Sequence, residues 1–279
     1  MKSICINGKM ISDQEPVLMA ANRSYRYGDG LFETMKMVNG KILLGDFHFE
    51  RLFTGLSLLQ FNAPKLFSKE LLSEKISEVC RKNSCEQLAR VRLSVSRGNG
   101  GLYDADNNLQ YVIECWPLND SVNCFNENGL VTGLYTAGRK TCDIFSNLKS
   151  ASFLPYVMAA LYARENKWND CLLMNTEGNI ADSTIANIFV IKNGIISTPA
   201  ASQGCVLGVM RRYLLTVLAQ NGFFVEEKPV TVTEIESADE VFLTNAINGI
   251  RWVGSFGSRT YSSVVATAIY NRFVKTIFF

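Results

Sequence analysis

The sequence predicts a mixed α+β protein in two halves, because hairpin turn signals separate its apolar segments more often than strand–helix–strand patterns do. Asn-Gly pairs, which favour tight type I′ turns, mark three of the expected hairpin turns, at 7–8, 39–40 and 193–194. The chain has 279 residues, enough for two domains of ordinary size. We expect a small α/β domain at 1–117, a polar linker at 118–129 and a larger domain at 130–279.

The first half contains the apolar patterns of strands and of two helices. Strands are expected at 4–7, 9–12, 31–38, 41–44, 89–96 and 110–116. A helix is expected at 47–59, with Asp46 as its N-cap, and a second helix at 69–82, with Ser68 as its N-cap. The glycine-rich stretch at 97–103 lies between two strands and does not read G-x-G-x-x-G, so we reject a dinucleotide-binding loop.

The second half also contains strand and helix signals, and the chain has no internal repeat. Strands are expected at 130–135, 171–174, 185–191, 223–227, 240–244 and 250–253. Helices are expected at 153–166, 206–220 and 261–278. Thr231 and Glu234 have the spacing of a capping box, which predicts a short additional helix there.

The composition is that of a core-rich protein with few charges. Hydrophobic residues make up 47% and charged residues 19%, and the net charge is +2. This balance gives no reason to expect nucleic acid or an anionic membrane as partner. No apolar run approaches the length of a transmembrane helix, and the N-terminus turns polar too early for a signal peptide. We therefore expect a cytoplasmic protein.

Cysteine and histidine give little support for a metal site in the sequence. The eight cysteines form no C-x-x-C pair, and His48 is the only histidine. This pattern argues against zinc and against a redox dithiol, so no metal is expected. We interpret several cysteines as small buried hydrophobic residues and His48 as a hydrogen-bonded structural imidazole.

Lys149 is the strongest candidate for chemistry. It is the only charged residue within 146–154, where its neighbours are small or apolar. Poor hydration lowers the pKa of a lysine, and its neutral amine is a nucleophile that forms Schiff bases with carbonyl compounds. The alternative interpretation is an ordinary lysine on a surface loop.

Six motifs place this lysine in a family context. They are YGDGLFET at 27–34, HxxRL at 48–52, RG at 97–98, LK at 148–149, DxxxxNIF at 182–189 and LGVMR at 207–211. Their order and spacing resemble the class IV aminotransferases, fold-type IV enzymes that use pyridoxal 5′-phosphate (PLP). The resemblance implies a small N-terminal α/β domain, a larger C-terminal domain with a pseudo-barrel of mainly antiparallel strands, and a homodimer.

The resemblance also implies which residues hold PLP. Lys149 would form the Schiff base and move the substrate proton. The phosphate ligands would be Arg51, the helix start formed by Gly208, Val209 and Met210, and a second loop containing Asn245 and Ala246. Asp182 stands where the family usually has glutamate beside the pyridine nitrogen, and it is one methylene shorter. For Asn187 the resemblance implies only a structural role, in support of the residues that hold PLP.

Phe32 and Arg97 are the implied substrate-binding residues, with Arg97 as a carboxylate anchor. Three segments favour 4-amino-4-deoxychorismate lyase, which releases pyruvate and 4-aminobenzoate: RGNGG at 97–101, GVMR at 208–211 and TNA at 244–246. Leu154 also replaces a tyrosine of the branched-chain enzymes. Against the lyase, Ser152 replaces an asparagine common in lyases.

Two alternatives remain. The first is a transaminase of branched-chain or D-amino acids that uses a 2-oxo acid. The second is a non-catalytic protein that binds PLP or another protein on the same scaffold. The joint presence of Lys149, Arg51 and an acid at position 182 argues against the second alternative.

Overall fold

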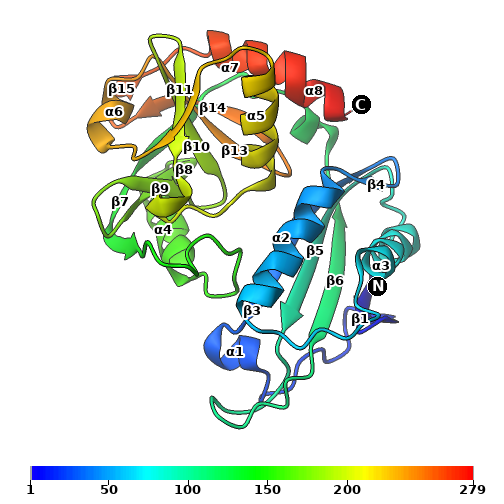
Figure 1. The fold of residues 1–279 in the computed structure, drawn as a ribbon. Helices are drawn as coiled ribbons and strands as arrows, with labels where there is room; N and C mark the ends of the chain where they lie inside the picture. Colours follow the sequence, from blue (N-terminus) through cyan, green and yellow to red (C-terminus); the bar gives the residue numbers. More distant parts are fainter. Residues whose placement is uncertain (1, 279) are drawn as a thin grey trace. The chain divides into compact units, whose positions relative to one another are not determined.

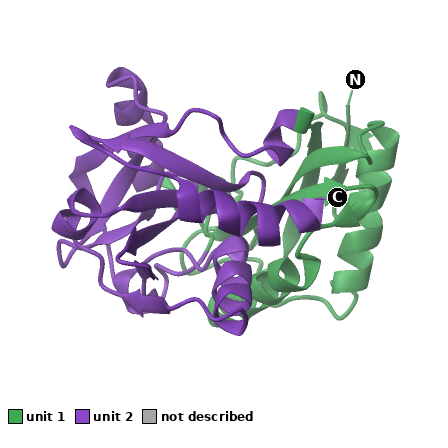
Figure 2. Cartoon of the chain, turned by 90° about the horizontal axis from the view of Figure 1, so that it is seen from above, with its two compact units in different colours: residues 1–120, 149–153 green, residues 121–148, 154–279 purple. Residues whose placement is uncertain are grey.

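The chain, described over residues 2–278 in a computed structural model, forms two compact units (Figure 2). Unit 1 consists of Met1–Asp120 and Lys149–Phe153, and unit 2 consists of Ser121–Leu148 and Leu154–Phe279. The boundary after Asp120 falls inside the stretch that the sequence predicts as a linker. The sequence did not predict that five residues following Leu148 belong to unit 1.

Unit 1 is an antiparallel sheet with helices. Its strands are β1 (Ser3–Ile6), β2 (Lys9–Ser12), β3 (Gly30–Val38), β4 (Lys41–Ile42), β5 (Leu88–Ser96) and β6 (Gln110–Pro117). Its helices are α1 (Arg23–Tyr27), α2 (Gly45–Leu58) and α3 (Lys69–Lys82). The strand order is β2-β1-β6-β5-β3-β4, and each pair is antiparallel.

Helices cover one face of this sheet, and Phe32 and Arg92 lie on the other. α2 packs on β3, and α3 packs on β1 and β6 (Figure 1). Directly opposed residues of neighbouring strands share a face, so Met35, Val91 and Cys115 form one buried row under these helices. Side chains alternate along a strand, which puts Phe32 and Arg92 on the opposite face.

The predicted turns are confirmed by the strand pairing. The closing pairs are Ile6 with Lys9, Val38 with Lys41 and Lys192 with Ile195. At the first of these turns Asn7 has φ of 49° and Gly8 has φ of 87°, the left-handed values that a type I′ turn requires. The chemistry of the turn residues therefore determines these three connections.

Helix α2 begins differently from the prediction. Its N-cap is Leu44, in the left-handed region with φ of 53°, and Leu44 makes no side-chain capping bond. Asp46 lies inside the first turn instead, where it pairs with Lys69. The predicted α3 is confirmed together with its cap, because the Ser68 hydroxyl accepts a hydrogen bond from Leu71 N at 3.3 Å.

Unit 2 is built on a larger sheet. Its strands are β7 (Leu130–Lys140), β8 (Asp170–Asn175), β9 (Ile180–Ser183), β10 (Asn187–Lys192), β11 (Ile195–Pro199), β12 (Val225–Lys228), β13 (Glu240–Asn245), β14 (Gly249–Phe256) and β15 (Arg259–Thr260). Its α-helices are α4 (Leu154–Glu165), α5 (Val209–Gln220), α6 (Val232–Glu236), α7 (Val264–Ile269) and α8 (Lys275–Phe278). Single turns lie at Asp120–Asn123, Ala201–Gln203 and Tyr270–Val274, the last a π-helical turn between α7 and α8.

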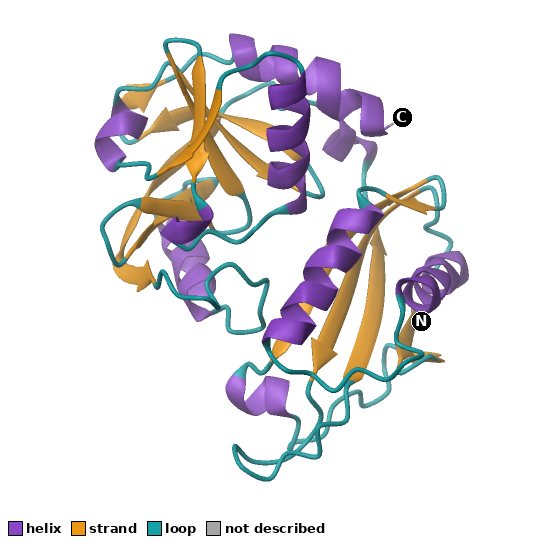
Figure 3. Cartoon of the chain, viewed as in Figure 1, coloured by secondary structure: helices purple, strands orange, loops and turns teal. Residues whose placement is uncertain are grey.

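The sheet of unit 2 has the order β12-β11-β10-β13-β14-β7-β8-β9, with β15 beside β14. Pairs β11–β12, β14–β7 and β7–β8 are parallel, and the other pairs are antiparallel. β9 also packs against β10 and β11, so the sheet curls back on itself, while α5 lies against β12 and β13 (Figure 3). This arrangement confirms the predicted α+β class with a half-barrel of mainly antiparallel strands.

Several boundaries in unit 2 differ from the prediction. Ile185 is 62% exposed and lies in a turn, so β10 starts two residues later, at Asn187. The helix expected from position 206 begins at Val209, because Gly208 is its N-cap. The predicted capping box is confirmed, since Thr231 and Glu234 bond reciprocally. Within residues 2–278, no helix combines the length and hydropathy needed to cross a bilayer.

Candidate functional site

The segment that carries Lys149 is attached to the open edge of β3. β4 pairs only with the last residues of β3, so the first residues of β3 are available to another segment. The carbonyl of Lys149 accepts a hydrogen bond from Phe32 N at 2.9 Å, and Ala151 N donates to Gly30 O at 2.8 Å. These backbone bonds fix the path of Lys149–Phe153 without using the lysine side chain.

The side chain of Lys149 is half-buried beside two aromatic rings. Its Nζ lies 4.7 Å from the ring centroid of Phe32 and 5.7 Å from that of Phe153. The two rings meet edge to face, with their centroids 5.5 Å apart. The aromatic surfaces limit access of water to the amine, which agrees with the poorly hydrated lysine expected from the sequence.

Arg51 is oriented by a buried carboxylate on β3. Its Nε donates to Oε1 of Glu33 at 2.8 Å and its Nη2 to Oε2 at 2.5 Å. Nδ1 of His48 lies 2.6 Å from the same Oε2, which confirms His48 as a hydrogen-bonded structural imidazole. Burial alone would raise the pKa of Glu33, but the Arg51 charge and the His48 contact lower it to about 2. Burial lowers the pKa of His48.

Replacement of this carboxylate is expected to cost stability in a pH-dependent way. The fall of the Glu33 pKa from 4.5 to about 2 is worth about 3 kcal/mol of unfolding free energy. A carboxylate whose pKa is lower in the folded state than in the unfolded state stabilises the fold fully at pH values above its unfolded-state pKa. Glu33→Gln should therefore show its full loss of unfolding free energy above pH 4.5. The deficit should shrink as the pH falls toward 2. Urea unfolding of wild type and variant at a series of pH values measures this difference.

Asp46→Asn is the matched control for Glu33→Gln. The side chain of Asp46 is 81% exposed, and its pair with Lys69 is screened by solvent. This variant should unfold at nearly the same urea concentration as wild type at each pH. A deficit in Glu33→Gln that is small or independent of pH would contradict the role of the carboxylate.

Arg97 and Arg92 have different surroundings in unit 1. The guanidinium of Arg97 donates to Asp29 Oδ2 at 2.9 Å and to the carbonyls of Leu59 and Gln60 at 2.6 and 3.0 Å. Its three nitrogens thus hold a turn together, and its role as a substrate anchor stays a prediction. Arg92, which sequence reasoning did not select, lies on the face of the sheet that carries Phe32; strand alternation in β5 was the available signal.

Arg92 lies against the same ring as the lysine. Its Cζ is 4.0 Å from the Phe32 centroid, and its Nε donates to Ser94 Oγ at 3.0 Å. Burial lowers the pKa of the guanidinium. A pocket of about 90 Å³ opens here within unit 1, and Arg92, Phe32 and Ala151 contribute to its lining. Within residues 2–278, no carboxylate lies at ion-pair distance from Arg92.

Asp182 is the centre of a buried polar group in unit 2. Its Oδ2 accepts hydrogen bonds from Lys140 Nζ at 3.1 Å, Tyr156 Oη at 2.9 Å and Val206 N at 3.0 Å. Burial and the neighbouring carboxylate raise the pKa of Tyr156 well above its usual range, so the phenol stays protonated and donates. Neither Lys140 nor Tyr156 was expected from the sequence, because they lie far from Asp182 along the chain.

The second oxygen of this carboxylate is suited to a ligand. Oδ1 of Asp182 is buried and has no hydrogen-bond partner among the described residues. A buried acceptor without a donor is costly, and the protonated ring nitrogen of PLP would supply the missing donor. The shorter side chain of aspartate is therefore compatible with the role that glutamate has elsewhere in the family.

Gly208 begins α5 and leaves room at the helix N-terminus. No side chain caps this end, so the first backbone N–H groups of Val209 and Met210 can face an anion. A Cβ on Gly208 would come within 2.0 Å of Oδ1 of Asn187. Nδ2 of Asn187 donates to Val206 O at 2.7 Å, which fixes the turn before the helix. The arrangement suits a phosphate group.

The other predicted phosphate loop is the turn between β13 and β14. Oδ1 of Asn245 accepts hydrogen bonds from Ile247 N at 3.0 Å and from Asn248 N at 2.8 Å. The side chain of Asn245 thus shapes the turn, and Ala246 lies within it. The binding roles of Asn245 and Ala246 stay predictions.

Asn147 is held against the segment that precedes α5 in unit 2. Asn147, two residues before Lys149, donates from Nδ2 to Cys205 O at 2.7 Å. Its own carbonyl accepts from Leu207 N at 3.2 Å. Asn147 is thus bonded to both neighbours of Val206, the backbone partner of Asp182, within unit 2.

Most of the chain matches a family model and relatives with described activities. A family model described as amino-transferase class IV matches residues 30–256. The D-alanine aminotransferase of Bacillus licheniformis is 27% identical over 265 residues, which cover 93% of this chain and 90% of that protein. The aminodeoxychorismate lyase of Vibrio harveyi is 26% identical over 232 residues, which cover 82% of this chain and 83% of that protein.

Solved structures give the same result for the fold. The branched-chain aminotransferase of the archaeon Thermoproteus uzoniensis, solved with norvaline, matches with a TM-score of 0.88 at 21% identity. The match covers 99% of this chain and 95% of that structure. Another branched-chain aminotransferase, solved in complex with N-(5′-phosphopyridoxyl)-L-glutamate, also has a TM-score of 0.88. The chain therefore belongs to the class IV aminotransferase family and is an enzyme with PLP as its cofactor.

Proposed function

We propose that the protein is a 4-amino-4-deoxychorismate lyase, which converts its substrate to 4-aminobenzoate and pyruvate. The observation that supports this proposal best is the position of Arg92 beside Phe32, on the ring that also contacts Lys149. Glu114 lies opposite Arg92 on β6 and its charge acts on the guanidinium, but the two form no close ion pair. A partly buried guanidinium without a close ion pair favours an anionic ligand. Aminodeoxychorismate carries a carboxylate on its ring and another on its enolpyruvyl group.

The lining of the pocket is consistent with a polar substrate. Besides Arg92 it includes polar side chains: Asn22, Ser24, Ser94, Ser96 and Gln110. Several of these groups already bond to one another, since Asn22 Nδ2 donates to Ser96 Oγ and to Gln110 Oε1. Our preference for a carboxylated ring over a branched-chain amino acid beside Phe32 therefore rests on the charge of Arg92.

Each catalytic residue has a defined task in this proposal. Lys149 would hold the cofactor and accept the proton from the substrate Cα. Bound PLP supplies an electron-withdrawing ring that stabilises negative charge at that carbon. Asp182 would accept a hydrogen bond from the pyridine nitrogen through Oδ1, and Arg51 and the start of α5 would hold the phosphate. Phe32 limits the access of water to the amine.

A transaminase is the second candidate, supported by the relatives. A protein described as a D-alanine aminotransferase shares 27% identity with this chain over most of its length. Both reactions use the same lysine and the same acid, so the site residues alone do not separate them. The two differ in whether an amino group is transferred to a 2-oxo acid.

The deciding experiment supplies both kinds of substrate to the PLP-loaded protein. Aminodeoxychorismate should yield equal amounts of pyruvate and 4-aminobenzoate. Amino acids supplied with 2-oxoglutarate should yield little glutamate. The opposite pattern would establish a transaminase, and absence of both activities in a PLP-loaded protein would favour a non-catalytic role.

Arg92→Leu tests the anchoring group itself. Loss of a charge-assisted hydrogen bond to a carboxylate should raise KM for aminodeoxychorismate by about 10- to 100-fold. Arg90→Leu is the matched control, because Arg90 lies on the same strand face but is exposed and stacks on Trp116. Unchanged KM in Arg92→Leu would remove the main support for this substrate.

We also propose a homodimer. Helix α4 exposes an apolar row at helical spacing: Leu154, Val157, Met158 and Leu161 are 69%, 48%, 43% and 36% exposed. Such a row normally packs against a partner surface. Sedimentation of wild type should give twice the chain mass, and Val157→Glu with Leu161→Glu should give the monomer. A monomeric wild type at working concentration would contradict the proposal.

The cysteines support a reducing compartment. Within the described residues all eight cysteines are free, and six of them are buried. Disulfides are rare where cytosolic thiols are kept reduced. We therefore place the enzyme in the cytoplasm, and a fluorescent fusion that localised outside it would contradict this placement.

A further inference from the structure

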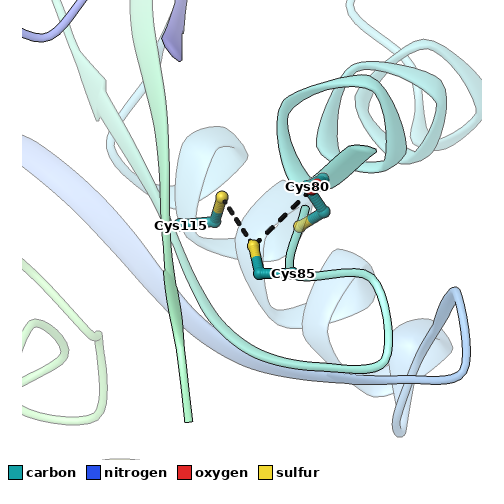
Figure 4. Close-up of side chains that lie close together, drawn as sticks. All are labelled: Cys80, Cys85 and Cys115. Atoms are coloured by element: carbon teal, nitrogen blue, oxygen red, sulfur yellow. Dashed lines mark hydrogen bonds between the residues drawn. The ribbon is translucent and has the colours of Figure 1, made fainter. Parts of the chain in front are cut away.

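Three cysteine side chains meet in the core of unit 1. Cys80 lies in the last turn of α3, Cys85 in the connection that follows, and Cys115 on β6 (Figure 4). Their exposed fractions are 0%, 4% and 3%. Cys115 faces α3, whereas Phe32 and Arg92 occupy the other face of the sheet, so this group lies outside the substrate pocket.

The three sulfur atoms are close enough to share one ligand. All lie within 4.8 Å of one another, and Sγ of Cys85 is 3.3 Å from Sγ of Cys115. Asn83 donates from Nδ2 to Sγ of Cys115 at 3.2 Å and to Ser3 O at 2.7 Å. Backbone N of Cys85 donates to Cys80 O at 3.0 Å. The fold thus holds the sulfurs together before any ligand arrives.

The donor set selects for a soft ion. Thiolates favour Cu(I), zinc and iron–sulfur clusters over hard cations. Structural zinc is almost always four-coordinate, and iron–sulfur clusters use four cysteines. Asn83 cannot supply a fourth ligand, because its Oδ1 accepts from Ser3 N at 2.8 Å while its Nδ2 is already donating. Three sulfurs match the three-coordinate geometry that Cu(I) accepts.

We propose that Cys80, Cys85 and Cys115 bind one Cu(I) ion. Binding forms three Cu–S bonds, and protons carried by the coordinated thiols pass to water. Copper remains Cu(I) throughout, and no electron is transferred. The polypeptide crosses from α3 to β5 through exposed residues next to Cys85, so a local opening of this connection admits the ion.

The experiment uses the full PLP-loaded chain with Cys124→Ser and Cys142→Ser, because these two cysteines are not buried and would compete. Under anaerobic, reducing conditions it is titrated with Cu(I) from a coloured chelator, and in parallel with Ag(I), which is less prone to redox side reactions. One ion per chain is expected. Cys115→Ala should lower the affinity by at least about 100-fold.

Cys171→Ala is the matched control, since Cys171 is equally buried but lies in unit 2. It should bind Cu(I) as the parent does. Uptake that is unchanged in Cys115→Ala, or no uptake in competition with the chelator, would overturn the proposal.

A second measurement does not depend on the folding of a variant. In the parent chain, Ag(I) should slow alkylation of Cys80, Cys85 and Cys115 together in mild denaturant, while Cys171 should react as before. Equal protection of Cys171, or protection of only one or two of the three, would overturn the proposal. So would recovery of a Cys85–Cys115 disulfide in place of bound metal.

Discussion

Lys149→Ala is expected to lose turnover by more than about 1,000-fold while retaining the fold. In the proposed function the lysine supplies both the covalent attachment of the cofactor and the base, and no other described side chain beside Phe32 offers an amine. Folding should survive because Lys149 is only half-buried and its segment is held by backbone bonds to β3. Pyruvate release measures turnover, and circular dichroism checks the fold.

A chemical readout separates loss of the lysine from loss of structure. Borohydride reduction of the PLP-loaded wild type should leave a phosphopyridoxyl group on Lys149, located by mass spectrometry of a digest. Lys140 is an informative control, because it lies nearby in sequence but is committed to a buried ion pair with Asp182. A label on Lys140, or substantial turnover by Lys149→Ala, would refute the assignment.

Asp182→Asn is expected to lower kcat by about 100-fold. An asparagine with its oxygen toward Lys140 and Tyr156 would place an amide donor opposite the pyridine N–H. The ring nitrogen would then lose its anionic partner, and the electron demand that lowers the barrier at Cα would weaken. The buried charge of Lys140 would also lose its partner, so lower thermal stability should accompany the fall in kcat.

Asp182→Glu distinguishes the catalytic effect from the structural one. It restores the carboxylate that the family usually has at this position, and it should retain kcat within about tenfold of wild type even if added volume costs stability. Tyr156→Phe removes one donor to Oδ2 and leaves the carboxylate in place. Full activity in Asp182→Asn would show that Oδ1 does not serve the ring nitrogen.

Local signals determined much of the fold. The Asn-Gly turns and the Ser68 cap could be predicted because each depends on a few adjacent residues. The start of α2 could not, because Leu44 adopts a left-handed conformation that its side chain disfavours. The segment Lys149–Phe153 was also missed, since its partner is the distant strand β3.

The candidate site also contains residues that local motifs indicate and residues that depend on contacts between distant segments. The motifs predict Lys149, Arg51 and Asp182 as site residues, because each sits in a short recognisable pattern. Glu33 and Arg92 were missed, since their roles arise from strand pairing and from burial beside residues on other elements. The three-cysteine group was missed for a related reason: its members come from a helix, a connection and a strand.

The pairing of Lys149–Phe153 with β3 limits how this protein can be divided or assembled. A fragment ending at Asp120 would contain the whole first sheet yet lack both the amine of Lys149 and the segment bonded to Gly30 and Phe32. During synthesis the ribosome must deliver residue 153 before the first unit can be completed. If the two halves are expressed separately, the first half should therefore be inactive, and the edge of β3 should lack its partner segment. An intact backbone between residues 120 and 149 is then a requirement for activity.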